Sequence, residues 1–122
     1  MANPNIVNVS DIKGKVVQAA LTTTLTTEII SAVTTGHIYK INSINVANID
    51  GSSAADVSVF ITKSGGSPIA IANTISVPAD STLVVVDKNN GFYLEEGDNI
   101  EAGASANGDL TITISYEEID DA

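Results

Sequence analysis

The sequence predicts an all-β protein, a single domain folded as an antiparallel β-sandwich or jelly roll of eight to ten short strands. Apolar and polar residues alternate in several segments, which is typical of strands with one buried face. Turn signals recur roughly every eight to twelve residues, as in sandwiches and jelly rolls. The 122 residues suffice for one core but not for two.

The clearest strand lies near the end of the chain. Its apolar residues alternate with Thr and Ser and are Leu110, Ile112, Ile114 and Tyr116. Asn107 and Gly108 supply a turn signal before it, so we predict a hairpin with the three-residue loop 107–109. This register sets the apolar residues opposite Ala106, Ala104, Ala102 and Ile100. Small residues opposite large ones leave space, which we expect a second sheet to fill.

In chain order, we predict an extended arm over residues 1–9, a sandwich domain over 10–116 and an acidic tail over 117–122. The arm and the tail carry apolar residues that can anchor on the same domain or on a neighbouring subunit. Together with the last residue of the final strand, the predicted inter-subunit contacts are Pro4, Ile6, Val7, Val9, Tyr116 and Ile119.

The first two strands are predicted around 15–21 and 26–33, where apolar residues recur every fourth position. That spacing also fits a helix, and a helical turn is the alternative. Seven Thr between 22 and 35 favour strands, because β-branched residues form poor helices. A longer strand follows over 37–49. Ile41 is out of phase with the apolar residues that follow it, so we predict a bulge near Asn42 and Ser43.

The middle strands are predicted from alternation and turns. Val57, Val59 and Ile61 share one face, and an odd-numbered loop would place Ile69, Ile71 and Ile75 on that same face. Residues 82–87 are apolar on both faces, which predicts a central strand covered on both sides. Short strands follow at 92–94 and around Ile100.

Composition excludes several classes of partner. The formal net charge is −10, and the five basic residues, all Lys, are scattered. Binding of nucleic acid or of an anionic membrane needs clustered basic residues, so we expect neither. The chain has no Cys and therefore no disulfide framework. The amino terminus lacks the basic start and apolar core of a signal peptide, and no apolar run is long enough to cross a bilayer.

The residues offer little catalytic chemistry, and we expect no enzyme, cofactor or metal site. His37 is the only histidine and no Cys accompanies it, so a nucleophile and base pair has little support. Glu95, Glu96, Asp98 and Glu101 suit a solvated acidic turn better than a paired-carboxylate site. Whether the first three bind a divalent cation stays open, because carboxylate oxygens suit calcium but no EF-hand spacing is present.

Four segments resemble small virion structural proteins of tailed bacteriophages, particularly those of marine cyanobacteria and other marine bacteria. They are MANPNIVNV at 1–9, YKINSINVANIDGSSAADVSV at 39–59, SVPADSTLVVVDKNNGFYLEEGDNIEA at 76–102 and SYEEI at 115–119. These are framework segments of strands and turns, so the resemblance transfers no catalytic or ligand residue. No capsid-binding motif is recognised in the amino-terminal arm.

The resemblance implies a particle component, most simply a head decoration or cement protein that binds and reinforces the outer lattice. The implied partners are the major capsid protein or other virion proteins, and the implied location is the virion, assembled in the bacterial cytoplasm. A homo-oligomer is expected, with a trimer favoured. The alternatives are a tail, neck or head-fibre component, or a carbohydrate-binding adhesion module that uses Tyr39, Phe92 and Tyr93.

Overall fold

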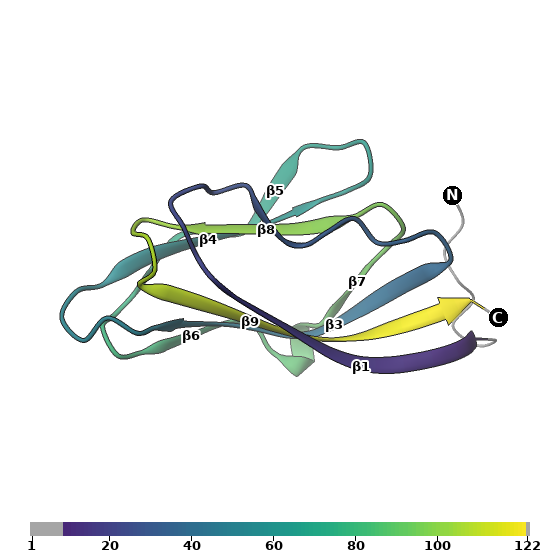
Figure 1. The fold of residues 1–122 in the computed structure, drawn as a ribbon, viewed down its shortest axis with the longest axis horizontal. Helices are drawn as coiled ribbons and strands as arrows, with labels where there is room; N and C mark the ends of the chain where they lie inside the picture. The colour runs from purple at the N-terminus through teal and green to yellow at the C-terminus, as the bar shows by residue number, and fades with distance from the viewer. Residues whose placement is uncertain (1–8, 122) are drawn as a thin grey trace.

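The computed structural model describes residues 9–121, which form two antiparallel β-sheets packed face to face (Figure 1). The elements are β1 (Val9–Ala20), β2 (Thr27–Ile30), β3 (His37–Asn48), β4 (Ala55–Thr62), β5 (Pro68–Val77), β6 (Thr82–Val86), the 3₁₀ helix η1 (Lys88–Asn90), β7 (Phe92–Leu94), β8 (Asn99–Ala104) and β9 (Leu110–Asp121). Among these residues there is no helix of the length and apolarity that a membrane span requires.

The strand order is that of a jelly roll. The larger sheet has the order β1-β9-β3-β6, with β7 paired to another part of β3, and the smaller sheet has the order β2-β8-β4-β5. Most successive strands lie in opposite sheets, whereas β4 and β5 form a hairpin within one sheet. The predicted fold class, an all-β antiparallel sandwich of eight to ten strands, is therefore confirmed.

The predicted hairpin at the end of the chain is wrong, because β8 and β9 belong to different sheets. Residues 105–109 carry the chain from one sheet to the other, and β8 pairs with β2 and β4 instead. Ala102 and Ala104 are buried in the same core cluster as Ile112 and Ile114. The alternation identified the buried face of each strand, but it did not specify the strand that lies beside it.

The core fills the space between the sheets. Its largest fully buried side chains are Leu21, Ile41, Ile44, Leu94, Ile100, Leu110, Ile112, Ile114, Val46, Val57, Val59 and Val77. The register of β3 against β9 shifts between Ile41 and Ser43, which confirms the predicted bulge. Because Asn42 is the extra residue, Ile41 returns to the same face as Ile44 and Val46, and all three are buried.

The strand predicted at 82–87 is not central. β6 lies at an edge of the larger sheet, and Val84 is 56% exposed. A continuous apolar run is therefore compatible with an edge position, where one apolar side chain faces outward.

β5 lies at an edge of the smaller sheet. The five-residue loop 63–67 has the predicted odd length, and Ile69 and Ile75 stand opposite Ile61 and Val57. Direct partners in an antiparallel pair point to the same side of the sheet, so this register agrees with the predicted shared face for Ile69 and Ile75. Two register shifts interrupt the β4–β5 pairing, and the three isoleucines of β5 remain exposed (Ile69, Ile71 and Ile75).

The first and the last strand of the larger sheet, β1 and β9, are both longer than predicted. β9 continues through Asp121, paired with β1 and β3, so residues 117–121 are part of the larger sheet and not a separate tail. β1 begins at Val9 instead of near 15, because β9 offers a long edge for it. Of the predicted contacts, Pro4, Ile6 and Val7 lie outside the described residues.

Candidate functional site

The inner face of the larger sheet changes from apolar to polar toward one end. Along β9, Ile112 and Ile114 face the core, and the same alternation continues through Tyr116, Glu118 and Asp120. The β3 bulge brings His37 onto this inner face, directly opposite Asp120. The ends of β1, β3 and β9 lie together there, at the right in Figure 1.

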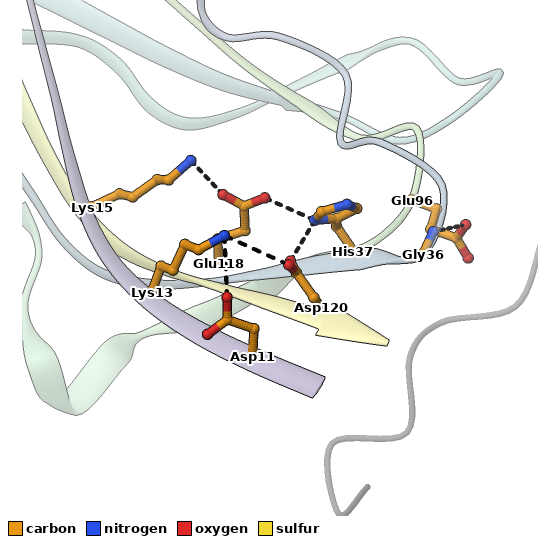
Figure 2. A network of polar contacts seen from close by, with 8 residues as sticks. All are labelled: Asp11, Lys13, Lys15, Gly36, His37, Glu96, Glu118 and Asp120. Atoms are coloured by element: carbon orange, nitrogen blue, oxygen red, sulfur yellow. Dashed lines mark hydrogen bonds and ion pairs between the residues drawn. The ribbon is translucent and has the colours of Figure 1, made fainter. Parts of the chain in front are cut away.

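We call this polar group the His37 cluster, and its members are Lys13, Lys15, His37, Glu118 and Asp120. Three adjacent strands supply them: β1 gives the two lysines, β3 the histidine and β9 the two carboxylates. Figure 2 shows the side chains pointing toward one another. Glu118 is the most buried, with its side chain 10% exposed, whereas that of His37 is 26% exposed.

The imidazole faces both carboxylates through a single atom. Nδ1 of His37 lies 2.8 Å from Oε2 of Glu118 and 2.7 Å from Oδ1 of Asp120 (Figure 2). The other oxygen of each carboxylate faces a lysine. Oε1 of Glu118 forms an ion pair with Lys15, and Oδ2 of Asp120 lies 3.9 Å from Nζ of Lys13.

Contacts between opposite charges shift the pKa values of Glu118, Lys15 and Lys13. The hydrogen bond from Lys15 holds the pKa of Glu118 below its ordinary value, although burial of the carboxylate acts in the opposite direction. The same contact raises the pKa of Lys15. Asp11 raises the pKa of Lys13, mainly through a side-chain hydrogen bond. At neutral pH the Glu118 carboxylate is therefore ionised, and the ammonium groups of Lys13 and Lys15 are protonated.

The turn before His37 is fixed by a buried carboxylate. Glu96 is 5% exposed, and its Oε2 accepts a hydrogen bond of 2.9 Å from the backbone N–H of Gly36 (Figure 2). Gly36 has a φ of +87°, a conformation that side chains with a Cβ rarely adopt. Glu96 thus positions the start of β3 and, through it, His37.

The acidic turn considered as a cation site has a structural role. Asp98 is 1% exposed. Its Oδ1 accepts a hydrogen bond from the N–H of Ser64, and its Oδ2 accepts from the N–H of Glu95 and from Nζ of Lys63. These three donors use both oxygens of Asp98 to hold the β4–β5 loop against the turn at 95–98.

The other predicted site residues are dispersed. Tyr116 lies on the inner face with its ring centroid 5.0 Å from that of Tyr39, and Ile119 is 6% exposed. Val9 opens β1 opposite Asp121. Of the aromatic residues proposed for sugar binding, Phe92 packs partly buried against the core while Tyr93 is 43% exposed. They do not form one exposed aromatic surface.

A second feature is the β5 edge, which we define as residues 68–77. Among residues 9–121 this strand pairs with β4 alone, and its burial pattern leaves only Ala72 and Val77 buried. It contains no charged residue. Ile69 is the most exposed of its isoleucines, at 66%.

Sequence reasoning missed the His37 cluster. A signal was present, because the two-residue alternation of β9 continues beyond Tyr116 as Glu118 and Asp120. The predicted bulge in β3 was the second signal, since it places His37, together with Ile41, on the same face as Ile44. Neither pattern identified β1 as the strand that supplies the lysines.

No protein-family model and no curated protein matches the chain. Among solved structures, it is similar to one described as Bacillus endospore appendages that form a family of disulfide-linked pili, with 14% identity, a TM-score of 0.56 and coverage of 100% of this chain and 96% of that chain. It is also similar to a chain of the infectious bursal disease virus particle, with 10% identity, a TM-score of 0.48 and coverage of 93% and 32%. A chain of the Ralstonia phage GP4 capsid gives 9% identity, a TM-score of 0.44 and coverage of 100% and 92%. At these identities the likeness to the Bacillus appendage protein concerns the fold alone.

Proposed function

We propose that this protein is a structural component of a tailed-bacteriophage particle, bound to the outer head lattice as a decoration or cement protein. The sequence segments at 39–59 and 76–102 support the class of protein. The observation that carries an assembly role is the β5 edge, which is open, apolar and uncharged.

The β5 edge stands out against the charge of the whole chain. A formal net charge of −10 makes copies of the protein repel one another over most of their surface. Ten residues without charge provide a strip where another subunit can approach without bringing carboxylates together. Exposed sheet edges present unpaired backbone groups, and exposed apolar side chains beside them are typical of contact surfaces.

The fold is compatible with this role without deciding it. Jelly rolls occur in viral capsid proteins, and also in lectins and cupins. The Bacillus appendage structure is described as disulfide-linked, whereas this chain has no Cys. Any polymer or lattice formed by copies of this chain is therefore not linked by disulfides.

The proposed partners are the major capsid protein or other virion proteins, together with copies of the same chain in a trimer. Repeated weak contacts in such an assembly become strong through multivalency. The predicted contact residues remain part of the proposal: those of the arm, namely Pro4, Ile6, Val7 and Val9, with Tyr116 and Ile119 in β9. The β5 edge adds Ile69, Ile71 and Ile75.

Copy number in purified particles tests the location. We expect quantitative mass spectrometry to find this chain in amounts comparable to the major capsid protein, because a decoration protein covers the lattice. A few copies per particle would indicate a tail, neck or head-fibre component instead. Complete absence from particles would refute the virion role.

Two matched variants test the β5 edge. Ile69→Lys and Ile49→Lys each place a charge at a similarly exposed isoleucine, at 66% and 64% exposure respectively. We expect Ile69→Lys to lower the affinity for stripped particles by about tenfold or more, which corresponds to about 1.4 kcal/mol. Ile49→Lys should bind as the unchanged protein does. Equal binding by both variants would contradict a contact through β5.

A further inference from the structure

The His37 cluster contains three potential metal ligands on two adjacent strands. One atom each from His37, Glu118 and Asp120 lies within 4.8 Å of the others. The backbone pairing of β3 and β9 holds His37 directly opposite Asp120, and Glu118 is two residues before Asp120 on the same face. The three groups are therefore brought together by the sheet itself and not by mobile loops.

The facing atoms of His37 and Asp120 lack hydrogen-bond partners. Nδ1 of His37 and Oδ1 of Asp120 are buried without a hydrogen-bond partner, although they lie 2.7 Å apart. A ring nitrogen carries at most one hydrogen, which can point at only one oxygen. One of the two carboxylates therefore faces Nδ1 without a proton between them. Buried polar atoms in that arrangement carry a substantial energetic cost.

The lysines leave the facing oxygens available. Lys15 pairs with Oε1 of Glu118, whereas Oε2 faces His37, and Lys13 approaches Oδ2 of Asp120, whereas Oδ1 faces His37. Each carboxylate thus has one oxygen held by an ammonium group and one directed at the centre of the cluster. Outer partners of this kind orient metal ligands and are common around protein metal sites.

We propose that His37, Glu118 and Asp120 bind a divalent transition-metal ion of the zinc type. One imidazole nitrogen and two carboxylate oxygens form a ligand set that Zn²⁺ accepts, at about 2.0–2.2 Å from the ion. At such distances, tetrahedral ligand atoms are about 3.4 Å apart, so small side-chain rotations open the present contacts enough. Three protein ligands would leave the fourth position of a tetrahedral zinc site to water.

The ligand types discriminate between metals. An imidazole nitrogen suits Zn²⁺, whereas Mg²⁺ and Ca²⁺ prefer sites made only of oxygen and higher coordination numbers. The site is also distinct from the acidic turn at 95–98, where Asp98 accepts three hydrogen bonds from Lys63, Ser64 and Glu95. This inference does not depend on the proposed particle role.

Titration of the full chain with ZnCl₂, followed by calorimetry and by NMR, tests the site. The protein must carry no histidine tag, because His37 is the only histidine and its ring signals are then unambiguous. We expect one Zn²⁺ per chain and saturable shifts of those ring signals. This readout uses the unaltered protein, so it does not depend on the folding of a variant. Absence of saturable binding, or binding without movement of the His37 signals, would overturn the site.

A matched pair of variants assigns the carboxylate. Glu118→Gln and Glu117→Gln make the same charge change at neighbouring positions of β9 that face opposite sides of the sheet. We expect Glu118→Gln and His37→Ala to weaken Zn²⁺ binding by about tenfold or more, and Glu117→Gln to leave it unchanged. CaCl₂ and MgCl₂ should bind at least about tenfold more weakly than ZnCl₂. Equal weakening by both Gln variants, or equal affinity for calcium and zinc, would refute the proposal.

Discussion

Lys63 and Asp98 form an ion pair between two loops that are distant in the sequence, with Nζ of Lys63 2.6 Å from Oδ2 of Asp98. Lys63 begins the loop between β4 and β5, and Asp98 ends the turn between β7 and β8. Asp98 also accepts hydrogen bonds from the backbone of Ser64 and Glu95. One buried carboxylate thus holds the loop of the β4–β5 hairpin, whose second strand is the β5 edge.

Replacing Asp98 by Asn should therefore destabilise the fold. The neutral amide loses the charge that Lys63 faces, and its N–H₂ group meets backbone donors that need an acceptor. We expect the free energy of unfolding, measured with urea, to fall by about 2–4 kcal/mol. Asp80→Asn is the control at an exposed turn residue with positive φ, which Asn tolerates, and it should change stability by less than about 0.5 kcal/mol. Similar losses in both variants would contradict this role of Asp98.

Gly103 in β8 lies against the segment that connects β1 and β2. A Cβ at this position would come within 2.5 Å of Cα of Leu25 and 2.8 Å of the carbonyl oxygen of Thr24. Backbone atoms cannot move aside as the end of a flexible side chain does, so Gly103→Ala should lower the unfolding free energy by about 1–3 kcal/mol. At Gly14 in β1 a Cβ meets nothing within 4 Å, so Gly14→Ala should be close to neutral. Thermal unfolding measures the stability of both variants. If Gly103→Ala is as stable as the unchanged protein, the segment between β1 and β2 moves to make room for the Cβ.

The sequence predicted which face of a strand is buried better than it predicted which strands lie side by side. Alternation in 110–116 identified the buried residues of β9, since a two-residue period fixes which side chains point inward. It could not reveal that β8 lies in the other sheet, because an Ala row is equally consistent with facing large residues across a sheet or across the sandwich. For β6, likewise, an apolar run did not predict whether other strands flank it on both sides.

The candidate sites were less predictable than the fold. His37 was considered alone, as a catalytic residue without a partner, whereas its contacts are Glu118 and Asp120, about eighty residues away in the chain. Their meeting requires both the pairing of β3 with β9 and the continuation of β9 to Asp121. Residues 117–122 were expected to form a tail because they are mostly acidic, and acidic composition does not reveal a pairing partner.

Asn48 provides a third test of stability. Its side chain is buried, and Nδ2 donates to the carbonyl oxygens of Val77 and Ser53 at 2.9 and 3.0 Å, which ties the end of β3 to the end of β5. Asn48→Ala leaves these acceptors unpaired, so the unfolding free energy should fall by about 1–3 kcal/mol in urea titrations. Asn89→Ala, at an exposed residue of η1, is the control and should change it by less than about 0.5 kcal/mol. Comparable effects would indicate that the buried amide contributes little.

Glu118 should make stability depend on pH in the acidic range. Lys15 lowers the pKa of the folded-state carboxyl below the ordinary value of 4.5 that applies in the unfolded chain. Folding therefore favours the ionised form, and this contribution is present above about pH 4.5 and is lost as the pH falls through the lowered pKa. Glu118→Gln cannot titrate and lacks the contribution at every pH.

The stability difference between the unchanged protein and Glu118→Gln should consequently be larger at about pH 7 than at about pH 3. Urea unfolding at the two pH values measures it, in buffers containing a chelator so that metal binding at the His37 cluster does not contribute. Glu117→Gln, with the same charge change on the outer face of β9, should show a difference that varies less with pH. If the stability difference between the unchanged protein and Glu118→Gln stays constant or grows at low pH, Lys15 does not stabilise the folded protein through this carboxylate.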